Sequence, residues 1–192
     1  MKRGFDLVLS LILLVLLSPL ITILAVAVAT TSSGSPLHRA RRVGRGGAEF
    51  TLFKLRTMRV GSGPGVTSSA DPRITRVGRL LRRTHLDELP QLWNVVRGDM
   101  SLVGPRPEDP RFVATYTAVQ RAVLAVRPGL TGPAQLAHRD EEQRLPAHDP
   151  EGAYVRDVLP GKLAIDLAYV RGRSFAGDLA ILARTIASAL GR

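Results

Sequence analysis

The chain has 192 residues, of which 45% are hydrophobic and 22% are charged, and 27 Lys and Arg against 16 Asp and Glu give a formal net charge of +11. This length allows one domain with a small appendage, and the composition supports a packed core, which excludes wholesale disorder. The sequence has no cysteine, which excludes a disulfide framework, a thiolate zinc site, an iron–sulfur cluster and a cysteine nucleophile.

The positive charge is concentrated in the middle of the chain. Residues 39–106 carry 14 basic and 5 acidic side chains, whereas residues 107–192 carry 11 basic and 10 acidic ones. A concentrated basic region favours an anionic partner, such as a nucleic acid, an anionic membrane surface or a phosphorylated substrate. A solvated basic face without any partner accounts for the same charge equally well.

Residues 7–29 form an uncharged apolar segment near the N-terminus. A helix of 23 residues measures roughly 34 Å, which is enough to cross a hydrocarbon core of about 30 Å. The apolar region of a cleaved signal peptide is only about 7–15 residues long, so this alternative is disfavoured. The sequence therefore predicts a membrane segment.

Two features of this segment favour a re-entrant hairpin over a span. Pro19 lies near its middle and opposes the carbonyl of Val15, so a break or a sharp kink is expected at Ser18 and Pro19, with the serine hydroxyl available to a freed carbonyl. Basic residues also lie on both sides of the segment, namely Lys2, Arg3, Arg39, Arg41 and Arg42. Because basic flanks favour the cytoplasmic side, both ends are expected on that side.

The rest of the chain is predicted to be one irregular domain that is mainly α with small irregular or β elements. We expect a re-entrant membrane hairpin and linker at residues 1–36 and a compact cytoplasmic catalytic domain at residues 37–192, with amphipathic helices at the membrane interface. The segment 73–83 has apolar residues at helical spacing and arginines on the other face, which predicts a basic amphipathic helix. Residues 50–58 fit a strand or a helical turn. Helices are predicted over 88–98, 111–126 and 177–190, and a loop over 138–152.

Adjacent carboxylates, Asp87 and Glu88, separate the basic helix from the helix that follows. Acidic residues in a first helical turn are common caps, so this position alone does not indicate chemistry. Five arginines precede the pair, however, and Arg106 follows in a rigid loop between Pro105 and Pro107. Carboxylates for a divalent metal, surrounded by guanidinium groups for phosphate, are typical of phosphoryl transfer.

The sequence resembles the monotopic phosphoglycosyl transferases, also called bacterial sugar transferases, over essentially its whole length. The matching motifs are Lys2-Arg3-Gly-Phe-Asp6, Ser18-Pro19, Phe53-Lys54-Leu-Arg56-Thr-Met58, Asp71-Pro-Arg73-Ile-Thr75, Leu86-Asp-Glu-Leu-Pro-Gln-Leu92, Gly98-Asp-Met-Ser-Leu-Val-Gly-Pro-Arg-Pro107, Arg127-Pro-Gly-Leu-Thr-Gly132 and the tail Asp166-Leu-Ala-Tyr169 with Ser174 and Asp178.

The resemblance implies transfer of a sugar 1-phosphate from a UDP-sugar to a polyprenyl phosphate such as undecaprenyl phosphate, at the bacterial inner membrane, as the first step of a surface glycan or glycoprotein glycan. It implies that Asp87 is the nucleophile and forms a phosphosugar-aspartate with release of UMP, and that Glu88 helps to hold Mg2+. The basic positions implied near phosphates or nucleotide are Lys54, Arg82, Arg106 and Arg139, and Asp166 matches a late acidic position without a defined role. The implied partners are the two substrates and membrane lipids, not nucleic acid, and a homodimer is compatible with the sequence.

Two departures from the family pattern lie near Arg139. Pro133 stands where an aromatic residue is frequent, and Ala137-His138-Arg139 stands in place of an Asn-Gly-Arg run, in a region expected to face the sugar or the nucleotide. The alternative from another class is a non-catalytic, membrane-anchored basic protein that binds nucleic acid or anionic lipid. It accounts for the charge and the anchor but gives no purpose to Asp87, Glu88 or the Pro105–Pro107 loop.

Overall fold

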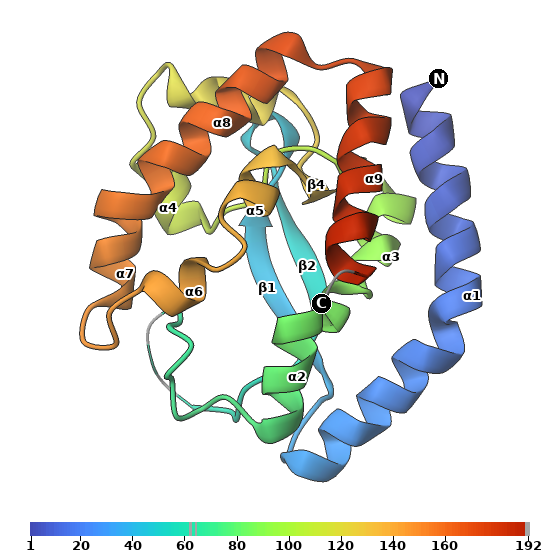
Figure 1. Ribbon diagram of the computed structural model, residues 1–192, viewed down its shortest axis with the longest axis vertical. Coiled ribbons are helices and arrows are strands. Elements are labelled where there is room, and N and C mark those ends of the chain that lie inside the picture. The colour runs from blue at the N-terminus through green and yellow to red at the C-terminus, as the bar shows by residue number, and fades with distance from the viewer. Residues whose placement is uncertain (62, 64, 191–192) are drawn as a thin grey trace.

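The computed structural model describes residues 1–61, 63 and 65–190. A long helix, α1 (Lys2–Thr31), lies along one side of a domain built from shorter helices and two small sheets (Figure 1). The predicted combination of mainly helical structure with small β elements is confirmed.

Both sheets have two strands. β1 (Leu37–Val43) and β2 (Glu49–Leu55) form an antiparallel hairpin joined by a short 3₁₀ turn, η1 (Arg45–Gly47), and β3 (Ser101–Val103) pairs in parallel with β4 (Gly129–Thr131). The segment 50–58, which the sequence left open between strand and helix, is therefore a strand as far as Leu55. The hairpin register places Lys54 opposite His38.

Helix α1 continues through Pro19, and it changes direction near its middle (Figure 1). Proline removes the N–H that would bond to the Val15 carbonyl, and the Ser18 hydroxyl donates to that carbonyl instead, at 2.8 Å. The predicted role of the serine is thus confirmed and the helix is bent, whereas the alternative of a complete break is wrong. Apart from a few positions such as Asp6, Ser10 and Val28, this helix is not buried by the domain.

Both ends of α1 are attached to the domain. At the N-terminal end, Lys2 pairs with Asp178 at 2.6 Å and Asp6 accepts a hydrogen bond from Ser101 at 2.7 Å. At the other end, Val28 packs with Leu55 and Leu81 in a buried cluster. By length and composition α1 can cross a membrane, but its two ends contact one and the same domain.

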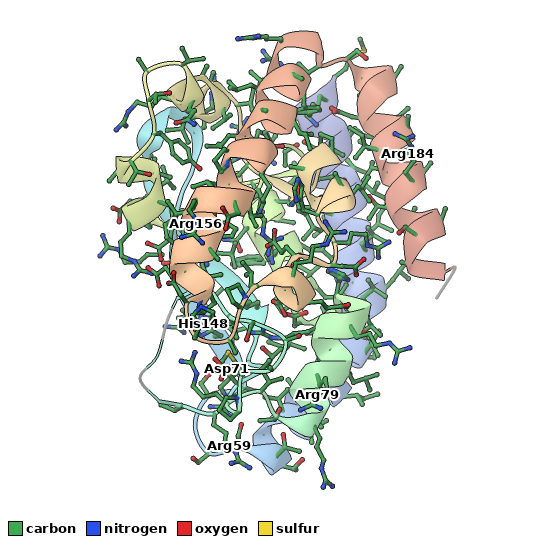
Figure 2. The ribbon with its side chains drawn as sticks, turned by 60° about the vertical axis from the view of Figure 1, so that its left-hand side comes forward. Arg59, Asp71, Arg79, His148, Arg156 and Arg184 are labelled. Carbon is green, nitrogen blue, oxygen red and sulfur yellow. The ribbon has the colours of Figure 1, made fainter. Side chains whose placement is uncertain are left out.

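Two predicted helices flank the acidic pair. The basic amphipathic helix is α2 (Arg76–Thr84), and α3 (Gln91–Arg97) ends at Gly98 in the left-handed conformation, as expected for a C-terminal glycine. Arg79 of α2 and Arg59 of the preceding segment lie at the same end of the molecule (Figure 2).

The prediction of one helix over 111–126 is wrong. The structure has a short helix α4 (Pro110–Ala114) and a 3₁₀ helix η3 (Gln120–Ala125). Between them, the Thr115 hydroxyl donates to the Phe112 carbonyl and Thr117 bonds with Gln120. Such local side-chain hydrogen bonds compete with a continuous helical ladder, and the apolar spacing alone did not reveal this interruption.

The segment predicted as a loop at 138–152 contains two helices of one turn each, so this prediction is wrong in part. They are α6 (Glu141–Arg144) and α7 (Pro150–Ala153); α5 (Pro133–Ala137) precedes them and a π-helical turn, η4 (Tyr154–Val158), follows. The chain ends in two longer helices, α8 (Leu159–Gly172) and the predicted amphipathic α9 (Phe175–Leu190). A cluster of buried residues joins α4, η3 and α8.

Candidate active site

The two carboxylates lie on a 3₁₀ turn, η2 (Leu86–Glu88), which follows α2 directly. His85 ends α2 in the left-handed conformation, with φ at 57°, and is the one described non-glycine residue with positive φ. This conformation is uncommon for a residue with a side chain and is frequently found at functional sites. It reverses the chain so that Asp87, 6% exposed, faces the interior.

The environments of the two carboxylates differ. Burial and the neighbouring Glu88 raise the pKa of Asp87 to about 6, although Lys54, Arg82 and Arg106 oppose the shift. Burial is also the largest single influence on Glu88 and acts to raise its pKa, but the charges of Arg106, His85 and Lys54 and the hydrogen bond from Arg106 together outweigh burial, so the pKa of Glu88 is lowered. Glu88 is therefore the firmly ionised member of the pair, and Asp87 holds its proton more readily.

Arg82 reaches the site from α2 because of a close contact one helical turn earlier. The Thr75 hydroxyl caps α2 by accepting from the Gly78 N–H at 2.8 Å. A side chain at Gly78 would collide with the Thr57 carbonyl, so glycine permits α2 to lie against residue 57. Arg82 then donates from Nε to the Thr57 hydroxyl at 2.9 Å, and its Nη1 donates to both carboxylate oxygens of Glu142 at 3.0 Å.

Arg106 reaches the site from an irregular loop that two glycines hold against β4. The Gly104 N–H donates to the Thr131 carbonyl at 3.0 Å and the Gly129 N–H to the Pro105 carbonyl at 2.8 Å. A side chain on Gly104 or Gly129 would collide with the facing backbone. Pro105 and Pro107 are buried, and the Arg106 guanidinium forms an ion pair with Glu88 at 3.1 Å.

Lys54 extends from β2 toward the same two carboxylates. Burial lowers the pKa of its ammonium, and the charges of Asp87 and Glu88 oppose that shift. The structure therefore brings five of the predicted site residues into one electrostatic cluster, namely Lys54, Arg82, Asp87, Glu88 and Arg106.

Asp166 and Arg139 occupy other positions. Asp166 lies on α8 behind the Arg106 loop, where burial raises its pKa to about 7 while Lys162 and the backbone N–H groups of Arg106 and Ala134 oppose the shift. Arg139 donates from Nη1 to the carbonyl of Ser188 on α9 at 3.0 Å. Asp166 thus supports the site from behind, and Arg139 contributes to the packing of the C-terminal helix.

Sequence reasoning missed the partners of these basic groups. Thr57 and Glu142 both bind Arg82, yet they are 25 and 60 residues away from it in sequence. The acidic run Asp140-Glu141-Glu142 was a visible signal for a cation-binding segment, but it does not indicate which cation is bound.

The described residues contain no group of three or more His, Cys, Asp or Glu side chains placed to hold a metal ion. Mg2+ is usually bound through one or two carboxylates, with water and substrate phosphates as its remaining ligands. The adjacent carboxylates of Asp87 and Glu88 match that smaller donor set when a diphosphate lies beside them. As a chemical arrangement, the cluster combines a buried carboxylate, a possible divalent-metal ligand and three cations suited to phosphate oxygens.

Comparison with known proteins agrees with this chemistry. The model of the family described as "Bacterial sugar transferase" matches residues 1–192. A UDP-glucose:undecaprenyl-phosphate glucose-1-phosphate transferase of Caulobacter vibrioides is 40% identical over 98% of this chain and 69% of its own length.

Two further relatives carry related names. An undecaprenyl-phosphate glucose phosphotransferase of Komagataeibacter xylinus is 40% identical over 96% of this chain and 35% of its own length. A UDP-galactose-lipid carrier transferase of Erwinia amylovora is 36% identical over 100% of this chain and 41% of its own length. The chain therefore spans less than half the length of these two curated relatives.

Proposed function

The chain belongs to the bacterial sugar transferase family of enzymes, and on that premise we propose that it transfers a sugar 1-phosphate from a UDP-sugar to a polyprenyl phosphate. The products are a polyprenyl diphosphate sugar and UMP, and this reaction begins the assembly of a bacterial glycan. The observation that carries the proposal is the buried Asp87, next to the ionised Glu88 and facing Lys54, Arg82 and Arg106. The substrates named for the relatives are a UDP-sugar and undecaprenyl phosphate.

In the first step, a carboxylate oxygen of Asp87 attacks the phosphorus that bears the sugar. The new bond between Asp87 and phosphorus forms as the bond from this phosphorus to the bridging oxygen breaks, and UMP leaves with that electron pair. Arg82, Arg106 and Lys54 would bind the phosphate oxygens, which stabilises the charge of the transition state and of the leaving group. A carboxylate is a weak nucleophile, so this charge neutralisation is what makes its attack feasible.

In the second step, a phosphate oxygen of the polyprenyl phosphate attacks the same phosphorus. The bond to Asp87 breaks, its carboxylate is regenerated, and the diphosphate bond of the lipid product forms. Glu88 would hold Mg2+ beside the diphosphate, and the ion supplies further charge neutralisation when bound. Dividing the transfer in this way allows a water-soluble donor and a membrane-bound acceptor to use one site in turn.

For the membrane arrangement, we propose that α1 enters and leaves by the cytoplasmic leaflet, with the domain on the cytoplasmic face of the inner membrane. The contacts at both ends of α1 support this arrangement: Lys2 pairs with Asp178, and Arg56 donates to the carbonyls of Ser32 and Gly34. If α1 spanned the bilayer, its two ends could not both contact one domain on one side.

The reaction is tested with purified enzyme, Mg2+ and a panel of UDP-sugars, without lipid acceptor. One donor should release up to one equivalent of UMP, and the enzyme should gain the mass of a sugar phosphate on the peptide that contains Asp87. Asp87→Asn should abolish both results, whereas Glu88→Gln should weaken the dependence on Mg2+.

Asp157→Asn is the control because Asp157 is exposed and pairs with Arg156. A fully active Asp87→Asn enzyme would contradict the covalent route, and salt-sensitive DNA retention without turnover would support the non-catalytic alternative.

The topology is tested with single cysteines, which are unambiguous because the chain has no other. Gly4 is exposed with open space around it, and Ser35 is exposed in the segment after α1. In whole cells, an impermeant thiol reagent should label neither Gly4→Cys nor Ser35→Cys from outside. Labelling of only one of the two would establish a span and contradict the re-entrant arrangement.

A further inference from the structure

Behind the Arg106 loop lies a buried polar network that the reaction steps above do not use. Its centre is Lys162 on α8, which is 3% exposed. The Lys162 ammonium lies 3.0 Å from a carboxylate oxygen of Glu141 and 3.6 Å from one of Glu108, and it donates to the Tyr154 hydroxyl at 3.0 Å. The Tyr154 hydroxyl in turn donates to Glu108 at 2.5 Å. A buried ammonium bound by two carboxylates and a phenol is costly to rearrange, because removing one partner leaves the others buried and unpaired.

The network is connected to Arg106 by the chain itself. Glu108 is two residues beyond Arg106, with the buried Pro107 between them. The Glu108 carbonyl also accepts from the Val43 N–H at 3.0 Å, which fixes this point of the loop to the end of β1. A loop held at Glu108 on one side and at Gly104 on the other has little freedom left for the residues between.

Electrostatic interactions also connect the buried network to Arg106. Glu88 in front and Glu141 and Glu108 behind all stabilise the positive charge of Arg106 and raise the pKa of its guanidinium. Among the contacts of the described residues, the ion pair with Glu88 uses one guanidinium nitrogen, Nη2. The other guanidinium N–H groups of Arg106 remain for a phosphate. Their direction is set by the position of the loop, so a shift of the loop would turn them away from the phosphate.

We infer that Tyr154, Lys162 and Glu108 are positioning residues for phosphoryl transfer, which hold the Pro105–Pro107 loop so that Arg106 faces Glu88 and the donor phosphates. This inference rests on the proposed function, because it assigns Arg106 to the phosphates. None of the three residues touches substrate in this assignment. Their effect on the rate passes entirely through Arg106.

The test is a double-mutant cycle between Tyr154→Phe and Arg106→Lys. Tyr154→Phe keeps the ring, which packs against Phe112, and removes only the hydroxyl that joins Lys162 to Glu108. In the wild-type background it should lower kcat/KM for UMP release about tenfold, since a small displacement of a catalytic contact has a large effect. In the Arg106→Lys background it should lower kcat/KM less than twofold.

A purely structural role would give another result. In that case Tyr154→Phe should lower the melting temperature by the same amount in the wild-type and the Arg106→Lys backgrounds. The factors by which Tyr154→Phe and Arg106→Lys each lower kcat/KM would then multiply in the double mutant, because independent effects add as free energies. Multiplying effects, or a normal rate for Tyr154→Phe, would overturn the inference. Glu108→Gln is the second variant, because it keeps the size of the side chain and the acceptor for Tyr154 but removes the charge facing Lys162. Like Tyr154→Phe, it should lower kcat/KM strongly in the wild-type background and only weakly in the Arg106→Lys background.

Tyr169→Phe is the matched control. The Tyr169 hydroxyl also donates to a carboxylate, that of Asp178 at 2.7 Å, which anchors α1 through Lys2. Its other acceptor is the Val103 carbonyl at the end of β3, at 3.3 Å, so the hydroxyl is bonded neither to Lys162 nor to Glu108. Its effect on kcat/KM should be the same in both backgrounds. Wild-type enzyme that releases no UMP from any donor would contradict the proposed function itself. Normal turnover without coupling would contradict only the positioning role.

Discussion

The two segments that bring arginines to the carboxylate pair are supported in different ways. Arg82 comes from a regular helix, and its ion-pair partner Glu142 has a side chain that is 43% exposed. Arg106 comes from an irregular loop, and its ion-pair partner Glu88 has a side chain that is 15% exposed and belongs to the carboxylate pair itself. Under the proposed function, Arg106 would thus be oriented before the substrate binds, whereas Arg82 would be held by a carboxylate that a substrate phosphate can displace.

The largest effect is expected at Arg106. Arg106→Ala should lower kcat/KM about a hundredfold, the magnitude typical of losing one preorganised donor to a developing charge. Arg106→Lys should recover only part of this loss, because an ammonium has no planar fork for two phosphate oxygens. The control is Arg111→Lys, since Arg111 is an exposed arginine paired with Asp109 and Glu151. Near-normal UMP release by both Arg106 variants would contradict a role of Arg106 in binding the donor phosphates.

The acidic limb of the pH profile should report Asp87. Its carboxyl has a pKa of about 6, so the rate should fall about tenfold per pH unit well below that value, because the protonated, neutral acid is a far weaker nucleophile than the carboxylate. Because Arg106 lowers the pKa of Asp87, Arg106→Ala should move this limb to higher pH. The measurement is the initial rate of UMP release between pH 5 and about 8. A flat profile down to pH 5 would be incompatible with Asp87 as the nucleophile.

A smaller effect is expected when the hydrogen bond that orients Arg82 is removed. Thr57→Val removes the hydroxyl that accepts from Arg82 Nε at 2.9 Å and preserves the shape of the side chain. It should raise KM for the UDP-sugar about tenfold, the value of one hydrogen bond to a charged group. Thr185→Val is the matched change on α9, where the hydroxyl bonds to Thr131 and to the Ile181 carbonyl. An equal rise in KM for both variants would indicate a general structural effect.

The smallest effect should be a gain in apparent affinity for the UDP-sugar, on removal of the charge of Glu142. Glu142→Gln removes the charge that occupies Arg82, so the donor diphosphate no longer competes with a carboxylate. KM for the UDP-sugar should fall about two- to fivefold, in line with the free energy of a partly exposed ion pair. Glu151→Gln provides the control, because Glu151 pairs with Arg111 and not with Arg82. This substitution should leave KM unchanged. A higher KM for Glu142→Gln would mean that this carboxylate supports the bound state rather than competing with it.

The sequence was most informative where structure depends on neighbouring residues. Pro19 predicted the bend of α1, the spacing of apolar residues and arginines predicted α2, and Gly98 predicted the end of α3. It was least informative over 111–158, where it predicted one helix that is interrupted at Thr115 and a loop that contains α6 and α7. Helices of one turn have too little periodicity to detect. Their place depends on tertiary contacts, such as the ion pair of Glu141 on α6 with Lys162 on α8 and the buried cluster that contains Ala153 of α7.

By itself, the amino-acid sequence determined the apolar helix with its bend, the basic helix, the adjacent carboxylates and the rigid loop around Arg106, because patterning, proline and glycine act over a few residues. Only the tertiary structure decided that Glu142 binds Arg82, that Glu88 binds Arg106 and that Lys162 lies buried behind the loop. Each of these pairs joins residues that are distant in sequence. Electrostatic partners are selected by distance and burial in the folded chain, and residue types along the sequence do not encode either one.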